Sequence, residues 1–425
     1  MPRQIPATGM NLFQLIYVLK REYTEKTGLP VMNLSLGNPD TIPEDEILEI
    51  QSRFAKDREF DFHTYAEDTD LRDFTVGMVE IHGGIKVADY EHLKALPIPG
   101  IKTAGALLPL ACGMHLPDRK KRDGFAVVSN LPAYDVIGTW SDSYLGSKRI
   151  VWPLASEDNM RLNLGRLKSA LSEAGRERAD LVYVIRPGNP AAVGATAAEW
   201  KELIEFCIER KMRLANDGAY TGLAGEDHVP LAQAAKDYPE LEWVEMYSVS
   251  KSFSDPGARL GAIVGSADFV DDYNMIKGNT ESGTVPYVMA AYGEFFKDRE
   301  RGRRSMRKRR EMYRERLAYL IPALEGAGFQ KACRTEAGFF TLWKAPKKAF
   351  GRILADDPQT KGLPAHEAFN RLVIGETGIV GVHFQGPVVN GRPEPLIRYA
   401  VCTDVLDKAF QERFEEQLER LRPEY

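Results

Sequence analysis

The sequence is poor in cysteine and has no long apolar run. Its 425 residues include only four cysteines, and these form neither a CxxC pair nor a closely spaced set. We therefore expect a reducing compartment, the cytoplasm, rather than a disulfide-stabilised protein. No apolar run approaches the roughly 18 residues of a membrane-spanning helix, and the first residues lack the apolar core of a signal peptide. A membrane partner is not expected.

The sequence also lacks the positive charge and the motifs of several other protein classes. Its net charge of -5 is not that of a nucleic-acid-binding protein. The one strongly basic run, at 301–310, continues into a segment with helical spacing and is interpreted as a solvated helix face. The histidines show no metal-ligand spacing, so no metal is expected. No G-x-G-x-x-G follows a predicted strand, which argues against a nicotinamide enzyme.

What the sequence does contain is an alternation of short apolar runs with helix-like stretches. Segments 11–26 and 198–211 have apolar residues at helical spacing. Short apolar runs that end in polar or Gly/Pro clusters predict buried strands. This alternation predicts an α/β fold with a mainly parallel sheet between helices. The predicted strands are 125–129, 181–185, 213–216, 244–249 and 260–264.

The length and a change of pattern predict two domains. A chain of this length suits one large domain and one smaller one. Beyond about residue 310 a long basic helix is followed by apolar segments at 338–343 and 396–401 and by an amphipathic helix near 406–421. We therefore predict a large domain at 46–309 and a smaller α+β domain formed by 1–45 and 310–425.

Polar side chains follow four of the predicted strands at the point where each strand ends. In a parallel sheet the carboxyl ends of the strands meet at one rim, where catalytic residues collect. We therefore expect these side chains to lie at a common site. They are Tyr134, Asn189, Asp217 with Tyr220, and Ser248 with Lys251 and Arg259.

These residue types are the ones that a site for pyridoxal 5′-phosphate (PLP) requires. A lysine forms a Schiff base with the aldehyde of the cofactor. A carboxylate pairs with the pyridine nitrogen and keeps the ring protonated, so that it withdraws electrons. The phosphate needs an arginine, hydroxyl groups and backbone N–H groups, often at the start of a helix.

The segment 248–261, SVSKSFSDPGARLG, resembles the lysine signature of the fold-type I aminotransferases of class I/II. The resemblance implies the PLP-transferase fold of type I, with Lys251 as the Schiff-base lysine. Ser248 and Arg259 would hold the phosphate. NDGAY resembles the Asp-x-x-Tyr motif of the family, so Asp217 would pair with the pyridine nitrogen and Tyr220 with the ring O3′.

Three further segments resemble parts of the cofactor site of this family. GNP resembles its Asn-Pro motif, which makes Asn189 a second O3′ partner that also lies near the substrate. SNLPAY resembles a Pro-x-aromatic segment, with Tyr134 stacked on the ring. TAGALL, at 103–108, resembles the phosphate turn. The backbone N–H groups that this turn would offer belong to Gly105, Ala106 and Leu107.

The remaining matches concern the substrate and a second subunit. SLGNPD resembles the segment that closes over the substrate, with Gly37 near its carboxylate, and LIRYAV resembles the strand whose arginine, here Arg398, binds the α-carboxylate. HTYAEDTDLR resembles the segment whose tyrosine, here Tyr65, reaches the phosphate of the partner subunit. MIKGNTESG, at 275–283, resembles the segment that reaches the partner's substrate, and it contains Lys277. The resemblance thus implies a homodimer with shared active sites.

The predicted function is transfer of an amino group between an α-amino acid and a 2-oxo acid. Other PLP reactions on the same fold, namely β-elimination, cyclisation and decarboxylation, remain alternatives. Ser248 and Lys251 also form an S-x-x-K motif, and 26–28 is a K-T-G, as in serine acyl-enzymes. In that class S-x-x-K precedes K-T-G, whereas here it follows, so this reading is remote. Asp255 departs from the lysine signature, which has an apolar residue there.

Overall fold

The computed structural model describes residues 12–118, 124–134, 136–389 and 391–425. The chain divides into two compact units. The larger unit comprises Asn38–Arg314 and Cys333–Phe339, and the smaller comprises Met1–Gly37, Glu315–Ala332 and Phe340–Tyr425. Residues 38–45, 310–314 and 333–339, which the sequence pattern assigned to the smaller domain, thus belong to the larger unit.

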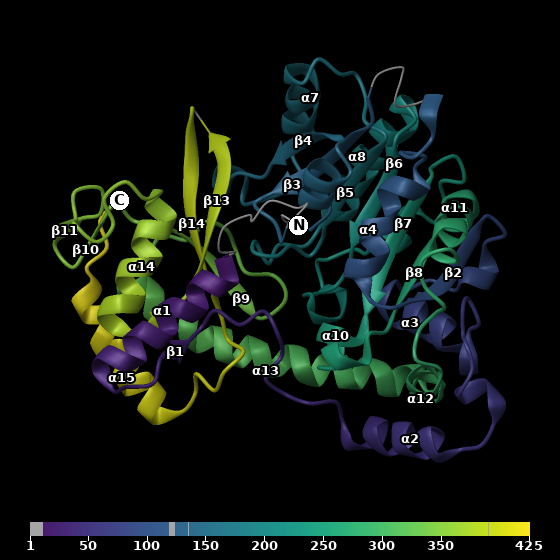
Figure 1. The fold of residues 1–425 in the computed structure, drawn as a ribbon, viewed down its shortest axis with the longest axis horizontal. Coiled ribbons are helices and arrows are strands. Elements are labelled where there is room, and N and C mark those ends of the chain that lie inside the picture. The colour runs from purple at the N-terminus through teal and green to yellow at the C-terminus, as the bar shows by residue number, and fades with distance from the viewer. Residues whose placement is uncertain (1–11, 119–123, 135, 390) are drawn as a thin grey trace, which may run out of the picture. The chain divides into compact units, whose positions relative to one another are not determined.

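A seven-stranded sheet forms the centre of the larger unit (Figure 1). Its strand order is β2-β8-β7-β6-β5-β3-β4. Strands β4, β3, β5, β6 and β7 are parallel, whereas β8 runs antiparallel to both of its neighbours. The strands are β2 (Leu93–Ile98), β3 (Ala126–Leu131), β4 (Lys148–Pro153), β5 (Leu181–Ile185), β6 (Arg213–Asp217), β7 (Trp243–Ser248) and β8 (Gly261–Ser266).

The predicted mainly parallel sheet is therefore confirmed. All five predicted strands exist within a few residues of their expected bounds. Because β3, β5, β6 and β7 are parallel to one another, the segments that follow them leave the sheet at the same rim. We call this edge of the sheet the carboxyl rim. The two outer strands β2 and β4 were not predicted.

Successive residues of a strand point to opposite faces of a sheet, and the buried strands here carry apolar residues on both faces. Helices therefore cover each face. On one face α4 packs against α11 and α6, over a core that includes Val127, Leu181 and Val244. On the other face α3, α8 and α9 lie against the sheet. The helices of the larger unit are α2 (Asp45–Lys56), α3 (Phe74–His82), α4 (Ile101–Ala111), α6 (Val136–Thr139), α7 (Leu164–Glu173), α8 (Ala197–Arg210), α9 (Leu231–Ala235), α10 (Val249–Ser252), α11 (Ala267–Lys277), α12 (Pro286–Phe296) and the first part of α13 (Arg299–Gly326).

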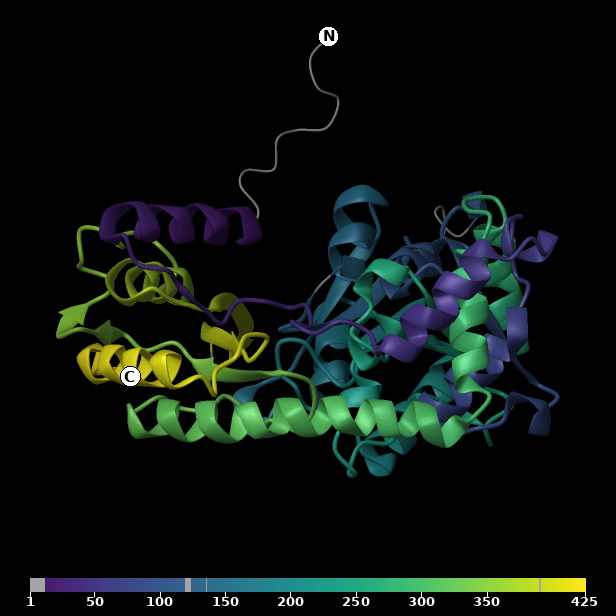
Figure 2. The ribbon, with the colours of Figure 1, turned by 90° about the horizontal axis from the view of Figure 1, so that it is seen from below.

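The smaller unit is built around a three-stranded antiparallel sheet of order β13-β14-β9. Helix α14 packs on this sheet, and α1 packs on α14 (Figure 2). A short parallel pairing of β1 with β12 joins the N-terminal segment to this unit. Its elements are α1 (Leu12–Thr27), β1 (Met32–Asn33), β9 (Phe340–Lys344), β10 (Lys348–Ala349), β11 (Arg352–Ile353), α14 (Ala365–Thr377), β12 (Ile379–Val380), β13 (Val382–Val389), β14 (Arg392–Ala400), α15 (Lys408–Leu421) and the end of α13.

Among the described residues, no helix combines the length and the apolar character that a membrane span requires.

Candidate active site

Asp217 is the last residue of β6 and stands at the carboxyl rim. Its carboxylate accepts the N–H of Ala219 at 3.0 Å and the hydroxyl of Tyr183 at 3.4 Å. Part of the side chain remains open to solvent. Burial nevertheless raises its pKa to about 6, against the lowering effect of these two hydrogen bonds and of the charge of Lys251. A carboxylate in this state gains from a further cation beside it.

Lys251 lies close enough to Asp217 for its charge to act on this carboxylate. It belongs to the single helical turn α10, which follows β7 directly, and β7 is the neighbour of β6 in the sheet. The Lys251 Nζ donates to Asn38 Oδ1 at 3.3 Å and lies 6.0 Å from the centre of the Phe339 ring. The residue as a whole is half-buried.

Arg259 lies beside the start of helix α4. Its guanidinium donates to the carbonyl of Pro99 at 3.1 Å and to that of Pro256 at 3.2 Å. Gly100, with φ +94°, precedes the helix, and a Cβ at this position would collide with the guanidinium. A cation and a helix N-terminus therefore converge on one exposed spot, which is a favourable arrangement for a phosphate.

The three residues predicted to offer N–H groups to this phosphate do not lie at the helix start. Gly105, Ala106 and Leu107 are inside α4, where each N–H is directed at the carbonyl four residues earlier. The N–H groups without a partner inside the helix belong to its first turn. We therefore correct this assignment to the backbone of Ile101, Lys102 and Thr103.

The turn that carries Lys251 is held by hydroxyl groups. Ser248 is buried and its Oγ accepts the N–H of Ser250 at 3.1 Å, which caps α10. The two serine hydroxyls are 2.8 Å apart. Asp255, which departs from the lysine signature, accepts the N–H of Ala258 at 3.2 Å and the hydroxyl of Tyr292 at 2.9 Å. It thereby fixes the turn that leads to Arg259.

Asn189 and Tyr134 are brought together at the rim by the backbone. The N–H of Tyr134 donates to the carbonyl of Asn189 at 2.7 Å. The Asn189 side chain is buried, whereas Tyr134 is 40% exposed. The Tyr134 ring lies 5.9 Å from the ammonium of Lys102, in the first turn of α4. An exposed ring at this place can cover one face of a flat ligand.

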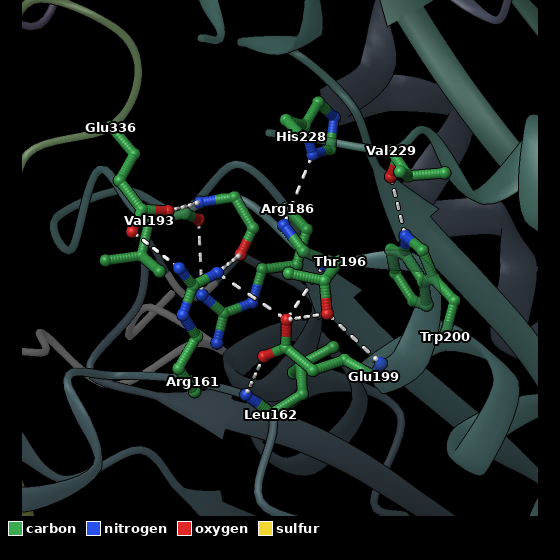
Figure 3. A network of polar contacts seen from close by, with 12 residues as sticks. Arg161, Leu162, Arg186, Val193, Thr196, Glu199, Trp200, His228, Val229 and Glu336 are labelled. Carbon is green, nitrogen blue, oxygen red and sulfur yellow. Dashed lines mark hydrogen bonds and ion pairs between the residues drawn. The ribbon is translucent and has the colours of Figure 1, made fainter. Parts of the chain in front are cut away.

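Figure 3 shows a polar network around Val193 and Thr196, at the end of the loop that also carries Asn189. The guanidinium of Arg161 lies 2.6 Å from the carboxylate of Glu336 and 3.5 Å from that of Glu199. Glu336 also accepts the N–H of Gly194 at 3.1 Å. Loop 187–195 is therefore tied to segment 333–339 of the same unit.

Arg186 supports the same loop from inside. It is fully buried and donates to the carbonyls of Val193, at 3.2 Å, and Met160, at 2.6 Å. Burial lowers its pKa to about 10, so it remains charged at neutral pH. A buried cation bound to two loop carbonyls limits the movement of this loop.

Tyr220 follows Asp217 in the turn after β6 and is buried. Its ring meets the edge of Phe339 at a centroid distance of 5.6 Å. Phe339 ends the segment that Glu336 secures, and its ring is also near Lys251. Tyr220, Phe339 and Lys251 therefore belong to one cluster.

Within the smaller unit, Arg398 and Gly37 lie together. Arg398 is in the central strand β14, is almost fully buried, and donates to the carbonyl of Ser35 at 2.9 Å. The rings of Phe340 and Phe384 lie 5.0 and 5.8 Å from its guanidinium carbon. A Cβ on Gly37 would stand 3.9 Å from the guanidinium, which is ordinary contact distance, so Gly37 lies directly beside Arg398.

Tyr65, assigned from the sequence to a contact with a second subunit, and Lys277, which lies in the segment matched to the partner's substrate, differ in exposure. Tyr65 is 77% exposed on the larger unit. Lys277 is 1% exposed, and its ammonium donates to the carbonyl of Glu67 at 2.7 Å and pairs with Glu281 at 3.2 Å. Lys277 is therefore not available to reach a substrate.

Four residues near the site were not predicted. The position of Tyr183 could have been inferred, since period-2 alternation in β5 places it on the same sheet face as Asp217. Ser250 and Asn38 were within motifs that were recognised but were not singled out. No signal in the sequence brings Phe339, which is distant in the chain, beside Lys251. Among the described residues, no group of three or more metal-ligating side chains occurs.

The sequence model of the family described as aminotransferase class I and II matches residues 30–413. The chain belongs to this family. It is thus an aminotransferase, an enzyme of amino acid metabolism, in a family that uses PLP to move an amino group between an α-amino acid and a 2-oxo acid. This match leaves the S-x-x-K reading without support.

Individual relatives and solved structures agree with the family. LL-diaminopimelate aminotransferases of Syntrophobacter fumaroxidans and Maridesulfovibrio salexigens are each 28% identical, covering 97% and 94% of this chain and 95% and 94% of their own. An aromatic aminotransferase from Pyrococcus horikoshii has a TM-score of 0.73 at 18% identity, over 95% of this chain and 98% of its own. Aspartate aminotransferase from Thermus thermophilus, solved with maleate, has 0.73 at 17%, over 96% and 95%. These structures support the fold.

Proposed function

We propose that this aminotransferase carries PLP on Lys251. In this proposal Asp217 pairs with the pyridine nitrogen, and Tyr220 and Asn189 bind the ring O3′. Tyr134 covers one face of the ring. The phosphate is held by Arg259, Ser248 and the first-turn N–H groups of α4. Gly37, Asn189 and Arg398 bind the substrate.

The observation that carries the proposal is the state of Asp217. Its pKa of about 6 is that of a carboxylate whose surroundings favour the ionised form too weakly. A protonated pyridine nitrogen beside this carboxylate would favour its ionised form. The exposed anion site beside Arg259 and Gly100 lies at the same rim, where the phosphate of the cofactor would bind. The residues present therefore fit the cofactor.

When bound, PLP supplies an aldehyde that condenses with amines and a cationic ring that withdraws electrons from the substrate Cα. The Lys251 Nζ removes the proton from this Cα and later returns a proton to the product side. Asp217 keeps the ring nitrogen protonated by remaining ionised. Asn38 accepts a hydrogen bond from the Lys251 ammonium and can orient it while it exchanges protons.

Arg398 is proposed to bind the α-carboxylate of the substrate. Its guanidinium lies between aromatic rings and carries one hydrogen bond to the Ser35 carbonyl, which fixes its orientation. A guanidinium can bind a carboxylate through two parallel hydrogen bonds. Fixing the carboxylate in this way restricts the orientations that the substrate Cα–H bond can take.

The test is a Lys251→Ala variant compared with wild type after loading with PLP. Wild type should show the visible absorbance of a lysine-bound cofactor, and the variant should lack this band. The variant should also release the cofactor more readily than wild type. An amino donor should convert the wild-type cofactor to the pyridoxamine form. Retention of the lysine-bound band in the variant, or release of pyruvate or ammonia in place of conversion, would contradict the proposal. Lys236→Ala, which removes a lysine outside the site, is the matched control.

LL-Diaminopimelate is proposed as the first amino donor to test. The support is that the two relatives above carry this name and match the chain over nearly its whole length. The panel should contain aspartate, an aromatic amino acid and LL-diaminopimelate, with 2-oxoglutarate as acceptor. A kcat/KM for aspartate or for the aromatic donor above that for LL-diaminopimelate would overturn this assignment.

We also propose a cytoplasmic homodimer with shared active sites. All four cysteines are buried thiols rather than disulfides, which supports a reducing compartment. The exposed Tyr65 supports a contact with the partner's phosphate. Hybrid dimers of Lys251→Ala chains and Tyr65→Phe chains test the sharing. If Tyr65 acts across the interface, each hybrid regains one intact site, and its activity exceeds the mean of the two parents. Activity at that mean would contradict sharing.

A further inference from the structure

Several contacts hold the loop that carries Tyr65, although its tip is exposed. The clamping residue is Lys277, the last residue of α11, which is almost fully buried. Its ammonium donates to the carbonyl of Glu67 at 2.7 Å and pairs with the carboxylate of Glu281 at 3.2 Å. Burying a lysine side chain costs free energy unless its charge is paired, and here the Glu281 pair and the Glu67 carbonyl offset that cost.

Further contacts hold the same loop against residues 274–283. The N–H of Glu67 donates to the carbonyl of Ser282 at 3.0 Å, so both backbone groups of Glu67 are bonded to this segment. Asn274 donates to the carboxylate of Asp68 at 3.3 Å. Gly283, with φ +99°, packs so closely on Glu67 that a Cβ would collide with its backbone.

The conformation of Glu67 itself requires this support. Its φ of +42° lies in the left-handed region, which a residue with a side chain adopts at a cost. Lys277, Ser282 and Gly283 contact the Glu67 backbone and hold it in this conformation. Two positions earlier, the Tyr65 side chain is 77% exposed. The loop is therefore rigid at its base and presents an aromatic hydroxyl to solvent.

We propose that Lys277 is a positioning residue that fixes the 65–68 loop so that Tyr65 is presented to the cofactor phosphate of a second copy of this chain. This inference rests on the proposed shared site. Lys277 acts through the Glu67 backbone and does not touch the ligand. A pre-positioned tyrosine binds the phosphate more tightly because the loop loses little conformational freedom on binding.

The experiment measures the rate of PLP release and its dissociation constant by absorbance in the dimeric holoenzyme. Lys277→Met is combined with Glu281→Gln, so that no buried carboxylate is left unpaired. We expect PLP to bind roughly tenfold more weakly, similar to the effect of Tyr65→Phe, which removes one hydrogen bond to a charged group. The variant that combines all three substitutions should release PLP no faster than Tyr65→Phe alone.

The control and a second variant keep the outcome decisive. Lys94→Met breaks another lysine–acid pair of α11, that of Lys94 with Asp271, and should leave PLP affinity unchanged. Asn274→Ala removes one exposed loop contact, is expected to fold normally, and should weaken PLP binding about twofold. Amide hydrogen exchange at Glu67 should accelerate in both loop variants.

Three results would overturn the inference. PLP affinity unchanged in the Lys277 and Asn274 variants, with Tyr65→Phe still weakened, would refute the clamp alone. Additive losses in the triple variant would show that Lys277 acts independently of Tyr65. An unchanged affinity in Tyr65→Phe would instead refute the shared phosphate contact, and the clamp with it.

Discussion

The two rims of the large sheet differ in how fully their charged side chains are paired. At the rim where β6 begins, Arg213 lies 2.6 Å from Asp272, also pairs with Glu242, and donates to the carbonyl of Ala111 at 2.9 Å. At the carboxyl rim, where β6 ends, Asp217 is bonded to one N–H and one hydroxyl, and its pKa is raised to about 6. Strand β6 thus begins at Arg213, whose charge is paired, and ends at Asp217, whose ionised form is poorly stabilised by its surroundings.

The difference shows that a hollow does not by itself mark the site of catalysis. A cavity of about 790 Å³ lies at the rim where β6 begins and is lined by Arg213, Glu242 and Asp272. Arg213 is paired there with both of these carboxylates. At the carboxyl rim, by contrast, burial raises the pKa of Asp217, and the exposed Arg259 lies beside the start of α4. These two features suit a ligand with one cationic and one anionic end.

The largest expected effect follows from neutralising the carboxyl rim. Asp217→Asn should lower kcat by roughly 10²–10³-fold, because the amide cannot hold the ring nitrogen protonated. Steady-state transamination with the best donor measures this loss. Substrate KM should change much less, since Asp217 does not contact the substrate carboxylate. A kcat within a factor of two of wild type would remove Asp217 from the mechanism.

The same substitution should stabilise the protein when no cofactor is bound. A carboxyl with a pKa raised from 3.8 to about 6 costs stability as pH rises through this window, because the folded state must give up a proton it holds more tightly than the unfolded state. That gap corresponds to at most about 3 kcal/mol, and solvent contact reduces it. We expect Asp217→Asn to be about 1–2 kcal/mol more stable at pH 8 and no more stable at pH 3.5. Urea unfolding at the two pH values checks this prediction.

A smaller effect is expected from Tyr183, which touches Asp217 but not the substrate. Tyr183→Phe removes a hydrogen bond to the carboxylate, so the pKa of Asp217 should rise further. A hydrogen bond of this length contributes about 1 kcal/mol or less. The acidic limb of the pH–kcat profile should therefore shift to higher pH by less than about one pH unit. An unchanged acidic limb would show that the hydroxyl does not influence Asp217.

The smallest effect is expected at the opposite rim. Asp272→Asn weakens one ion pair of Arg213, while Glu242 and the Ala111 carbonyl still bind the guanidinium. Because Asp272 is 46% exposed, the loss of stability should be about 0.5–1 kcal/mol. Thermal unfolding should register this loss with kcat and KM unaltered. A shift of the acidic limb of the pH–kcat profile as large as that of Tyr183→Phe would remove the contrast between the two rims.

The parts of the site that are contiguous in sequence could be predicted, and the parts assembled from distant segments could not. Strand ends and their polar residues, such as Asp217 and Lys251, follow from local periodicity and from the geometry of a parallel sheet. The motif at 103–108 pointed to helix α4, whereas the N–H groups without a partner inside that helix belong to residues 101–103. A motif fixes the segment, whereas the residue at which the helix begins, Gly100 followed by Ile101, fixes which N–H groups are available.

Order along the chain was enough to determine the parallel sheet, the rim and the chemical types gathered there, since β-strand alternation and strand-end residues are local properties of a sequence. Only the folded chain decided that Phe339 meets Lys251, that Lys277 is buried against Glu67, and that the pKa of Asp217 lies near 6. These outcomes depend on contacts between segments far apart in the chain and on the exclusion of water by all of them together. A local sequence pattern encodes neither the contacts between distant segments nor the exclusion of water.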